Sequence, residues 1–299
     1  MSNIIAQYIN GNYMVTLYDN GKKKRKTADK YFNAFFPESI DCKITNCCPI
    51  GCPMCHEQST PQGKHGRIME LDFINSLHPG TEIAIGGGAV TSHPKLIEFL
   101  NKLKEQKLIA NITVNQLEFK KNKDLIDYLV QNKLIYGLGV SFYDFDDAFW
   151  DNLIKSNDNV VVHLIAGIHG QDVFDYLASK NAKILILGYK NWGRGALLLQ
   201  TKEGKVINKK IEWLKDNLKN YIKKFQVVSF DNLAITQLHV RDILPPKVWQ
   251  EFYQGDDGTH TMYVDCVKEE FAQTSTSVDR FPLLDNIDDM FHIVKEKKF

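Results

Sequence analysis

Residues 44–58 read ITNCCPIGCPMCHEQ and contain four of the six cysteines in this chain of 299 residues. Cys42 lies just before this stretch, whereas Cys266 is far away in the sequence. A secreted protein held together by disulfides would spread its cysteines over the loops that they join. The clustering instead indicates a set of metal ligands.

Within this stretch, Cys48, Cys52 and Cys55 have the spacing CxxxCxxC. Three thiolates on one short loop can hold three irons of a four-iron, four-sulfur (4Fe-4S) cluster and leave the fourth iron without a protein ligand. That iron can chelate the amino and carboxylate groups of S-adenosylmethionine (SAM) and pass an electron to its sulfonium. A zinc site with a further ligand and a group of inert buried thiols are the alternatives.

The sequence around the cysteines predicts a parallel α/β fold. Short apolar segments alternate with stretches whose apolar residues recur three and four positions apart, a pattern typical of strands followed by helices. Six such units imply a parallel sheet covered by helices, either an open six-stranded barrel or a doubly wound sheet. In both, reacting groups gather at the carboxyl ends of the strands. The predicted strands are Ser39–Thr45, Glu82–Ile85, Ala110–Asn115, Gly137–Phe142, Asn159–Ala166 and Ala182–Leu187.

Together these features resemble the radical SAM superfamily, whose members carry this cysteine spacing in the loop after the first strand of a partial (β/α)6 barrel. The resemblance covers roughly residues 39–190. It implies one 4Fe-4S cluster held by the three spaced cysteines, SAM as cosubstrate, and a small electron donor such as flavodoxin or ferredoxin. Only Cys48 gives the family spacing, so we interpret Cys47 and Cys42 as structural.

The resemblance also implies contacts to SAM. Met54 stands where the family usually has an aromatic residue whose backbone meets the adenine. Gly86, Gly87 and Gly88 resemble the family's GGE motif, in which the missing Cβ lets the backbone approach the methionyl amino group. Ala89 replaces the acidic residue of that motif, so a carboxylate role is not expected here.

Polar residues at the ends of later strands extend the predicted SAM site. Asn115 and Ser141 close the third and fourth strands, where they are expected to contact ribose or the methionyl carboxylate. His163 interrupts an apolar strand and is either a core histidine or part of the site. After the sixth strand, Lys190 or Arg194 either pairs with a carboxylate of methionine or substrate, or is an exposed loop charge.

Three regions are expected: an N-terminal β-hairpin and linker over 1–38, the barrel over 39–200, and a C-terminal α+β extension over 201–299 without a second cluster. Residues 1–30 carry six basic and two acidic residues, a net charge of +4. This suits either a charged, solvated edge or a surface for an acidic partner. In the extension we expect a long helix at Asn208–Phe225 and then a second hairpin.

The extension also contributes to the predicted function. Cys266 is either a small buried hydrophobe or a thiol that gives a hydrogen atom to the substrate radical, as in radical epimerases that act on peptides. The favoured substrate is a peptide or protein, because the second hairpin resembles extensions that add a strand to an extended chain. A nucleoside, nucleotide or tRNA base is the second hypothesis, and a non-catalytic iron-sulfur or electron-transfer protein is the third.

Composition limits the class of protein further. Hydrophobic residues make up 43% and charged residues 24%, which is typical of a soluble globular chain. The 37 basic and 36 acidic residues give a net charge of +1, so a nucleic-acid partner is possible but not favoured. No apolar run approaches the ~18 residues of a membrane helix, and the N-terminus lacks the features of a signal peptide. We therefore expect a cytoplasmic protein without membrane contact.

Overall fold

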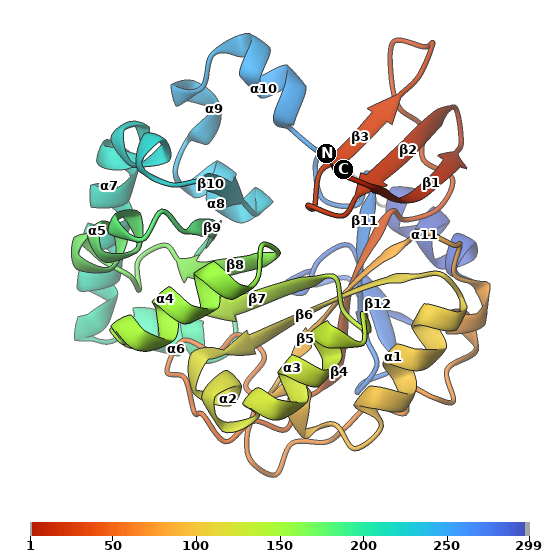
Figure 1. Cartoon of the computed structure of the whole chain (residues 1–299), viewed down its shortest axis with the longest axis horizontal. Helices are drawn as coiled ribbons and strands as arrows, with labels where there is room; N and C mark the ends of the chain where they lie inside the picture. Colours follow the sequence, from red (N-terminus) through yellow and green to blue (C-terminus); the bar gives the residue numbers. More distant parts are fainter. Residues whose placement is uncertain (1, 297–299) are drawn as a thin grey trace.

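A ten-stranded sheet forms the centre of the fold in this computed structural model, which describes residues 2–296 (Figure 1). Its strands are β4 (Ser39–Thr45), β5 (Glu82–Gly87), β6 (Ile109–Asn115), β7 (Gly137–Ser141), β8 (Val160–Ile165), β9 (Lys183–Leu187), β10 (Val227–Phe230), β11 (Thr261–Asp265), β12 (Glu270–Ala272) and β13 (Phe281–Pro282). They follow the order β10-β9-β8-β7-β6-β5-β4-β11-β12-β13. All neighbours from β10 to β11 are parallel, and β12 pairs antiparallel with both β11 and β13.

The six predicted barrel strands are confirmed as β4 to β9, with bounds that agree within two residues. The expected second hairpin is present as β11 and β12. The difference lies in the extension, which adds β10 beside β9 and β11 beside β4 to the same sheet. Both added strands satisfy backbone groups that would otherwise be unpaired at the edges of the six-stranded sheet.

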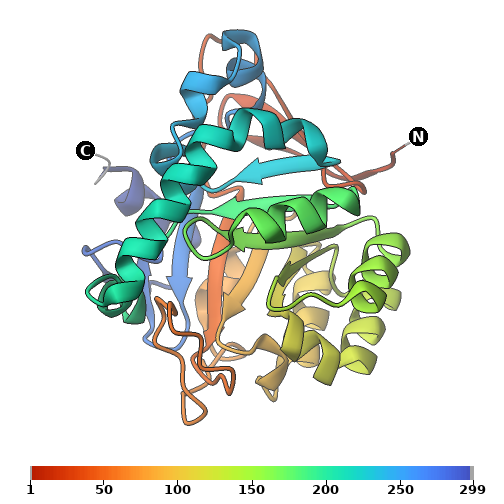
Figure 2. The same ribbon diagram turned by 90° about the vertical axis from the view of Figure 1, so that its left-hand side faces the viewer.

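Helices connect the parallel strands, and Figures 1 and 2 show α1, α3 and α4 along the same side of the sheet. The predicted long helix is α7, which begins earlier than expected because the Thr201 hydroxyl accepts a hydrogen bond from the Glu203 amide. The α-helices are α1 (Leu96–Glu105), α2 (Gln116–Lys121), α3 (Lys123–Gln131), α4 (Asp147–Ser156), α5 (Gln171–Ser179), α6 (Arg194–Leu199), α7 (Lys202–Tyr221), α8 (Asn232–Gln237), α9 (Val240–Ile243), α10 (Pro246–Phe252) and α11 (Ile287–Glu296). The 3-10 helices are η1 (Asp72–Ser76), η2 (Val90–Ser92) and η3 (Ile222–Lys224). Among residues 2–296, no helix has both the length and the apolar character that crossing a membrane requires.

The two faces of the parallel sheet differ in burial. One face, the outer face, carries side chains such as Ile85, Val140 and Leu164, which pack in the core with helix residues such as Leu100 and Trp150. Each such side chain contributes about 1.5–3 kcal/mol by leaving water. The opposite face, the inner face, carries polar residues and is only partly covered along β6 and β8. The core therefore lies under the helices and leaves the inner face available for a site.

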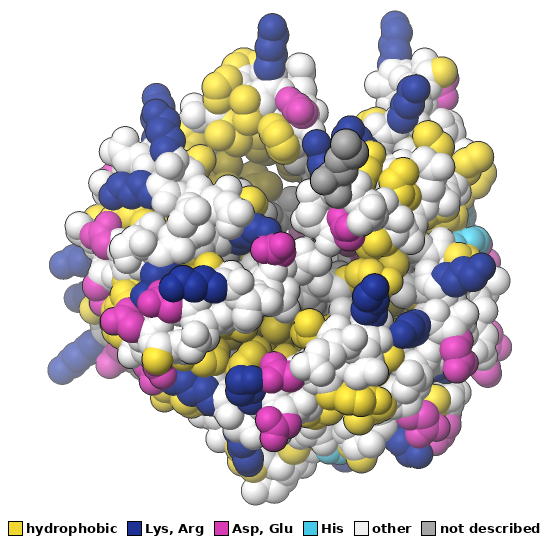
Figure 3. Space-filling model, viewed as in Figure 1, with side chains coloured by type: hydrophobic (Ala, Val, Ile, Leu, Met, Phe, Trp, Pro, Cys, Tyr) yellow, Lys and Arg dark blue, Asp and Glu magenta, His cyan; other side chains and the backbone are white. Residues whose placement is uncertain are grey.

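The expected N-terminal hairpin is confirmed and has a third strand. β1 (Ile4–Asn10), β2 (Tyr13–Tyr18) and β3 (Lys23–Lys26) form a separate antiparallel sheet. Arg25 Nε lies 2.7 Å from Glu38 Oε1, and Lys23 Nζ lies 2.5 Å from Glu82 Oε2. Part of the basic charge in this region is therefore neutralised by the starts of β4 and β5. Figure 3 shows a hollow with hydrophobic side chains on its wall between α10 and this sheet.

Candidate metal and cofactor site

The cysteine loop, residues 46–66, follows β4 and is closed by its own backbone hydrogen bonds. The Cys48 amide donates to the Thr60 carbonyl at 2.8 Å, and the Thr60 amide donates to the Asn46 carbonyl at 3.1 Å. The carboxyl ends of β4 and β5 also meet here, since these strands are parallel neighbours. The loop thus has a defined shape at the edge of the sheet where reacting groups of parallel α/β folds gather.

The thiols of Cys48, Cys52 and Cys55 are partly exposed on this loop. Burial raises the pKa of Cys52, and the nearby Cys55 and Cys48 raise it further. Burial also raises the pKa of Cys48, whereas the amide groups of Ile50 and Gly51 oppose that rise by hydrogen bonding to its sulfur. The three sulfurs are therefore close enough to interact electrostatically.

The residues present fit a 4Fe-4S cluster with three protein ligands. A cube-shaped cluster takes each thiolate at a separate iron, so its ligands do not converge on one point as the ligands of a single zinc ion do. Three soft sulfur donors on one loop, with backbone amides at one of them, match this requirement. Among residues 2–296, no group of three His, Cys, Asp or Glu side chains is arranged around a position for a single metal ion.

The other three cysteines have different surroundings. Cys47 Sγ is 3.3 Å from the Pro61 carbonyl oxygen, to which it donates a hydrogen bond. Cys42 and Cys266 are buried in the core with their sulfurs 3.5 Å apart. Because Lys43 and Asp265 face each other on the inner face, these two buried cysteines belong to the outer face. The structure does not bring Cys266 to the inner face, where a thiol that gives a hydrogen atom to the substrate radical would lie, and it buries this side chain in the core.

The three glycines at the end of β5 have different surroundings. A Cβ on Gly87, whose φ is +116°, would lie 2.4 Å from the Thr45 carbonyl oxygen, and one on Gly88 would lie 2.3 Å from that of Cys47. These two glycines let the start of the cysteine loop approach β5. A Cβ on Gly86 would meet no atom of residues 2–296 within 4 Å, its two chain neighbours aside. Gly86 is therefore the member of the motif that leaves open space for a ligand beside the backbone.

Three predicted site residues lie side by side on the inner face. The strand register pairs Asn115 with Ser141 and Ser141 with His163. Burial lowers the pKa of His163 to about 4, so its ring is neutral at pH 7. A Cβ on Gly139 would lie 2.4 Å from this ring, so glycine provides the space that the imidazole occupies. Asn115 Oδ1 accepts the Leu117 amide at 2.9 Å, which caps α2.

An ion network beneath the cysteine loop was not predicted from the sequence. Lys43 Nζ lies 2.6 Å from Glu57 Oε2 and 3.1 Å from Asp265 Oδ2. The Tyr263 hydroxyl donates to Glu57 Oε1 at 3.0 Å. Burial alone would raise the pKa of Glu57, but the hydrogen bond and charge of His56 and the charge of Lys43 hold it well below its usual range. The sequence signals were Lys43 in β4 and Asp265 in β11, charged residues that each stand between two apolar neighbours.

Lys190 and Arg194, one of which was considered as the partner of a carboxylate, have other partners here. Lys190 Nζ donates to Ser275 Oγ at 2.8 Å and lies 3.2 Å from His56 Nε2. Arg194 Nε donates to the Cys52 carbonyl at 3.1 Å, and its Nη1 donates to the Ser59 carbonyl at 3.0 Å. Arg194 therefore contacts the backbone of the cysteine loop and not a carboxylate.

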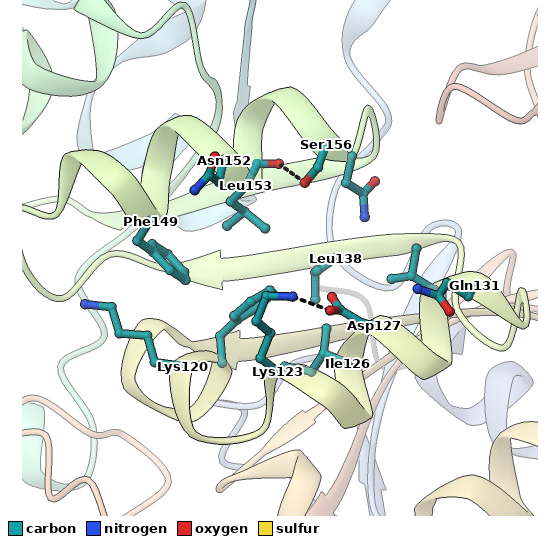
Figure 4. A pocket seen from close by; sticks show the side chains of 13 residues that line it. Lys120, Lys123, Ile126, Asp127, Gln131, Leu138, Phe149, Asn152, Leu153 and Ser156 are labelled. Atoms are coloured by element: carbon teal, nitrogen blue, oxygen red, sulfur yellow. Dashed lines mark hydrogen bonds and ion pairs between the residues drawn. The ribbon is translucent and has the colours of Figure 1, made fainter.

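A pocket of about 470 Å³ lies on the other side of the sheet, between α3 and α4 (Figure 4). Leu138 of β7 and Phe149 of α4 provide apolar walls, and Lys123 and Asp127 form an ion pair at its side. None of its lining residues belongs to the cysteine loop or to the group Asn115, Ser141 and His163 on the inner face. This pocket is therefore separate from the candidate site.

The structure therefore combines a parallel α/β sheet with a three-cysteine loop after its first barrel strand. Solved structures of Streptococcus suis SuiB have the same fold. SuiB bound to the precursor peptide SuiA matches with a TM-score of 0.59 and 12% identity over 89% of this chain and 66% of the SuiB chain. SuiB bound to S-adenosylmethionine matches with a TM-score of 0.55 and 12% identity, covering 89% and 65% of the two chains. A third SuiB structure gives a TM-score of 0.55 and 13% identity, covering 89% and 67%.

The radical SAM fold predicted from the sequence is thereby confirmed. This chain spans about two thirds of the length of the SuiB chains that it matches. No protein-family model and no curated protein matches the sequence.

Proposed function

We propose that this chain is a radical SAM enzyme that modifies a peptide or protein. The observation that carries the proposal is the cysteine loop with Cys48, Cys52 and Cys55, which follows β4, together with the open space beside Gly86 on the neighbouring strand β5. When bound, a 4Fe-4S cluster supplies the electron that cleaves SAM to methionine and a 5′-deoxyadenosyl radical, which removes a hydrogen atom from the substrate.

The chain's own residues bind and orient the two reactants. The backbone at Gly86 receives the methionyl part of SAM, because no Cβ blocks its approach. The Ser141 hydroxyl and the side-chain Nδ2 of Asn115 offer hydrogen bonds at the carboxyl ends of their strands. His163 adds a neutral ring deeper on the inner face, where it can accept or donate one hydrogen bond without bringing a charge. Met54 provides an apolar contact for the adenine.

Two observations support a peptide as the substrate. SuiB was crystallised with a precursor peptide, and its fold matches 89% of this chain. The C-terminal part of this chain joins the sheet through β11 and contains the β11–β12 hairpin, which resembles extensions that add a strand to an extended chain. A nucleic-acid substrate receives less support, because Glu38 and Glu82 neutralise Lys23 and Arg25 of the basic N-terminal sheet.

The proposal is tested by anaerobic loading with iron and sulfide, followed by reduction with dithionite in the presence of SAM. We expect 5′-deoxyadenosine from the wild-type protein, and none from Cys48→Ala. The matched control is Cys47→Ala. Cys47 is adjacent in sequence to Cys48, but its thiol donates a hydrogen bond to the Pro61 carbonyl. Absence of 5′-deoxyadenosine from cluster-loaded wild-type protein would favour the non-catalytic iron-sulfur protein.

Mass spectrometry of cellular peptides and nucleosides, with and without the active protein, identifies the substrate class. We expect a mass change in a peptide. A change confined to nucleosides or tRNA would contradict the peptide proposal while leaving the radical SAM chemistry intact. A flavodoxin or ferredoxin that replaces dithionite in this assay would establish the proposed electron donor.

A further inference from the structure

The segment Gly193-Arg194-Gly195, which begins α6, packs directly against the cysteine loop. Besides its two side-chain bonds to the carbonyls of Cys52 and Ser59, Arg194 donates its backbone amide to the Cys55 carbonyl at 3.1 Å. One residue thus bonds three carbonyls, and two of these belong to predicted cluster ligands. The planar guanidinium can bond two carbonyls at once because its N–H groups point in fixed directions.

The glycines on either side are required for this close approach. A Cβ on Gly193, whose φ is +55°, would lie 2.3 Å from the His56 carbonyl oxygen. A Cβ on Gly195 would lie 2.4 Å from the Lys190 carbonyl oxygen and 3.3 Å from that of Met54. Larger residues at either position would therefore separate the segment from the loop or distort its turn.

The segment is itself fixed to the scaffold. The buried Tyr189 hydroxyl donates to the Gly195 carbonyl at 2.8 Å, and the Tyr189 amide donates to Gln237 Oε1 at 2.8 Å. These bonds connect the segment to the end of β9 and to α8. The segment that contacts the cysteine loop is therefore held by hydrogen bonds to the end of β9 and to α8.

The charge of Arg194 is not neutralised by a neighbouring acid. Its side-chain hydrogen bonds go to neutral carbonyls, and within the described residues no carboxylate forms an ion pair with it. A positive charge beside a redox centre stabilises the state that carries one more electron. The potential of an iron-sulfur cluster depends on nearby charges and hydrogen bonds of this kind.

On this basis, and resting on the proposed function, we propose that Arg194 is a positioning residue that holds the cysteine loop in its cluster-binding shape and raises the reduction potential of the bound cluster. Its bonds act on the loop backbone, whereas its charge acts on the cluster through space. The two effects are separable, because lysine keeps the charge but lacks the fork that bonds two carbonyls.

The test compares four variants with the wild-type protein after anaerobic reconstitution, without SAM. Iron and sulfide per chain measure occupancy, and an EPR-monitored redox titration measures the midpoint potential of the loaded fraction. Arg194→Gln is expected to reduce cluster occupancy. It is also expected to lower the midpoint potential by at least about 59 mV, which for one electron is a tenfold change in the reduction equilibrium. Arg194→Lys is expected to reduce occupancy and to leave that equilibrium within about threefold of the wild type.

Gly193→Ala is expected to reduce occupancy although the arginine is still present. Arg67→Gln is the matched control, since Arg67 is exposed and its charge is already paired with Glu269 and Glu70, and it should equal the wild type in both measurements. Wild-type occupancy and potential in Arg194→Gln would overturn the inference. If that variant does not fold, wild-type occupancy in Arg194→Lys would overturn the positioning role. A wild-type protein that takes up no iron would refute the proposed function itself.

Discussion

Replacing Gly86 with alanine tests whether the open space beside this glycine receives SAM. Apart from its chain neighbours, no atom of the described residues lies within 4 Å of a Cβ on Gly86, and its φ is not in the left-handed region. The substitution should therefore keep the fold or stabilise it by about 0.4–1 kcal/mol, because alanine has fewer unfolded conformations. Gly88→Ala is the contrast, because its Cβ would lie 2.3 Å from the Cys47 carbonyl oxygen and displace the loop.

The new methyl group at position 86 would occupy space that the methionyl part of SAM needs. Overpacking of this kind costs about 1–3 kcal/mol, which corresponds to a loss of SAM affinity of about five- to 150-fold. Calorimetric titration of cluster-loaded protein measures the affinity, and urea unfolding of the apoprotein measures stability. We expect Gly86→Ala to lose affinity without losing stability, and Gly88→Ala to lose iron as well. Unchanged SAM affinity in Gly86→Ala would refute the placement of SAM at this strand end.

Three further predictions concern groups away from that glycine. Cys266→Ala should leave the deuterium content of the product formed in deuterated water unchanged, because the thiol lies in the core. The substitution should also reduce the free energy of unfolding by about 1 kcal/mol. A change in deuterium content would instead show that Cys266 is a hydrogen donor. Burial alone would raise the pKa of Glu38, but the hydrogen bonds and charges of Arg25 and Lys23 lower it from 4.5 to about 2. Its ion network therefore stabilises the folded state above pH 4.5 by on the order of 3 kcal/mol and loses this contribution as the pH falls toward 2. Urea unfolding at several pH values should show this loss in the wild type but not in Glu38→Gln. His163 should keep a neutral ring between pH 5.5 and 8, and an NMR titration with a midpoint near 6.5 would contradict its placement.

The parallel sheet could be predicted from the sequence because its signals are local. β4 begins and ends at the residues predicted from the alternation of strand-like and helix-like segments, and the cysteine loop follows it directly. The roles of β10 and β11 were not predictable in this way. Val264 pairs with Cys42 across more than two hundred residues, and no short-range pattern specifies which sheet edge a later strand joins.

Within the site, the thiols and the glycine motif were recognisable because their residue types and spacing are unusual. The contacts of Arg194 were not, since its partners are backbone carbonyls, which any residue provides. The Glu57 network was missed for a similar reason. Its charges come from three separate segments, and only folding places Lys43, Glu57 and Asp265 together. Sequence patterns thus identify ligands more readily than the residues that hold them in place.

The most direct test of the central claim is a Mössbauer spectrum of protein reconstituted with ⁵⁷Fe, recorded before and after addition of SAM. In the proposed function, three thiolates from the cysteine loop would leave one iron of the cluster without a protein ligand. We therefore predict the signal of a 4Fe-4S cluster in which one iron site changes when SAM is added. A spectrum without such a cluster, or a cluster whose four irons all remain unchanged with saturating SAM, would contradict the account.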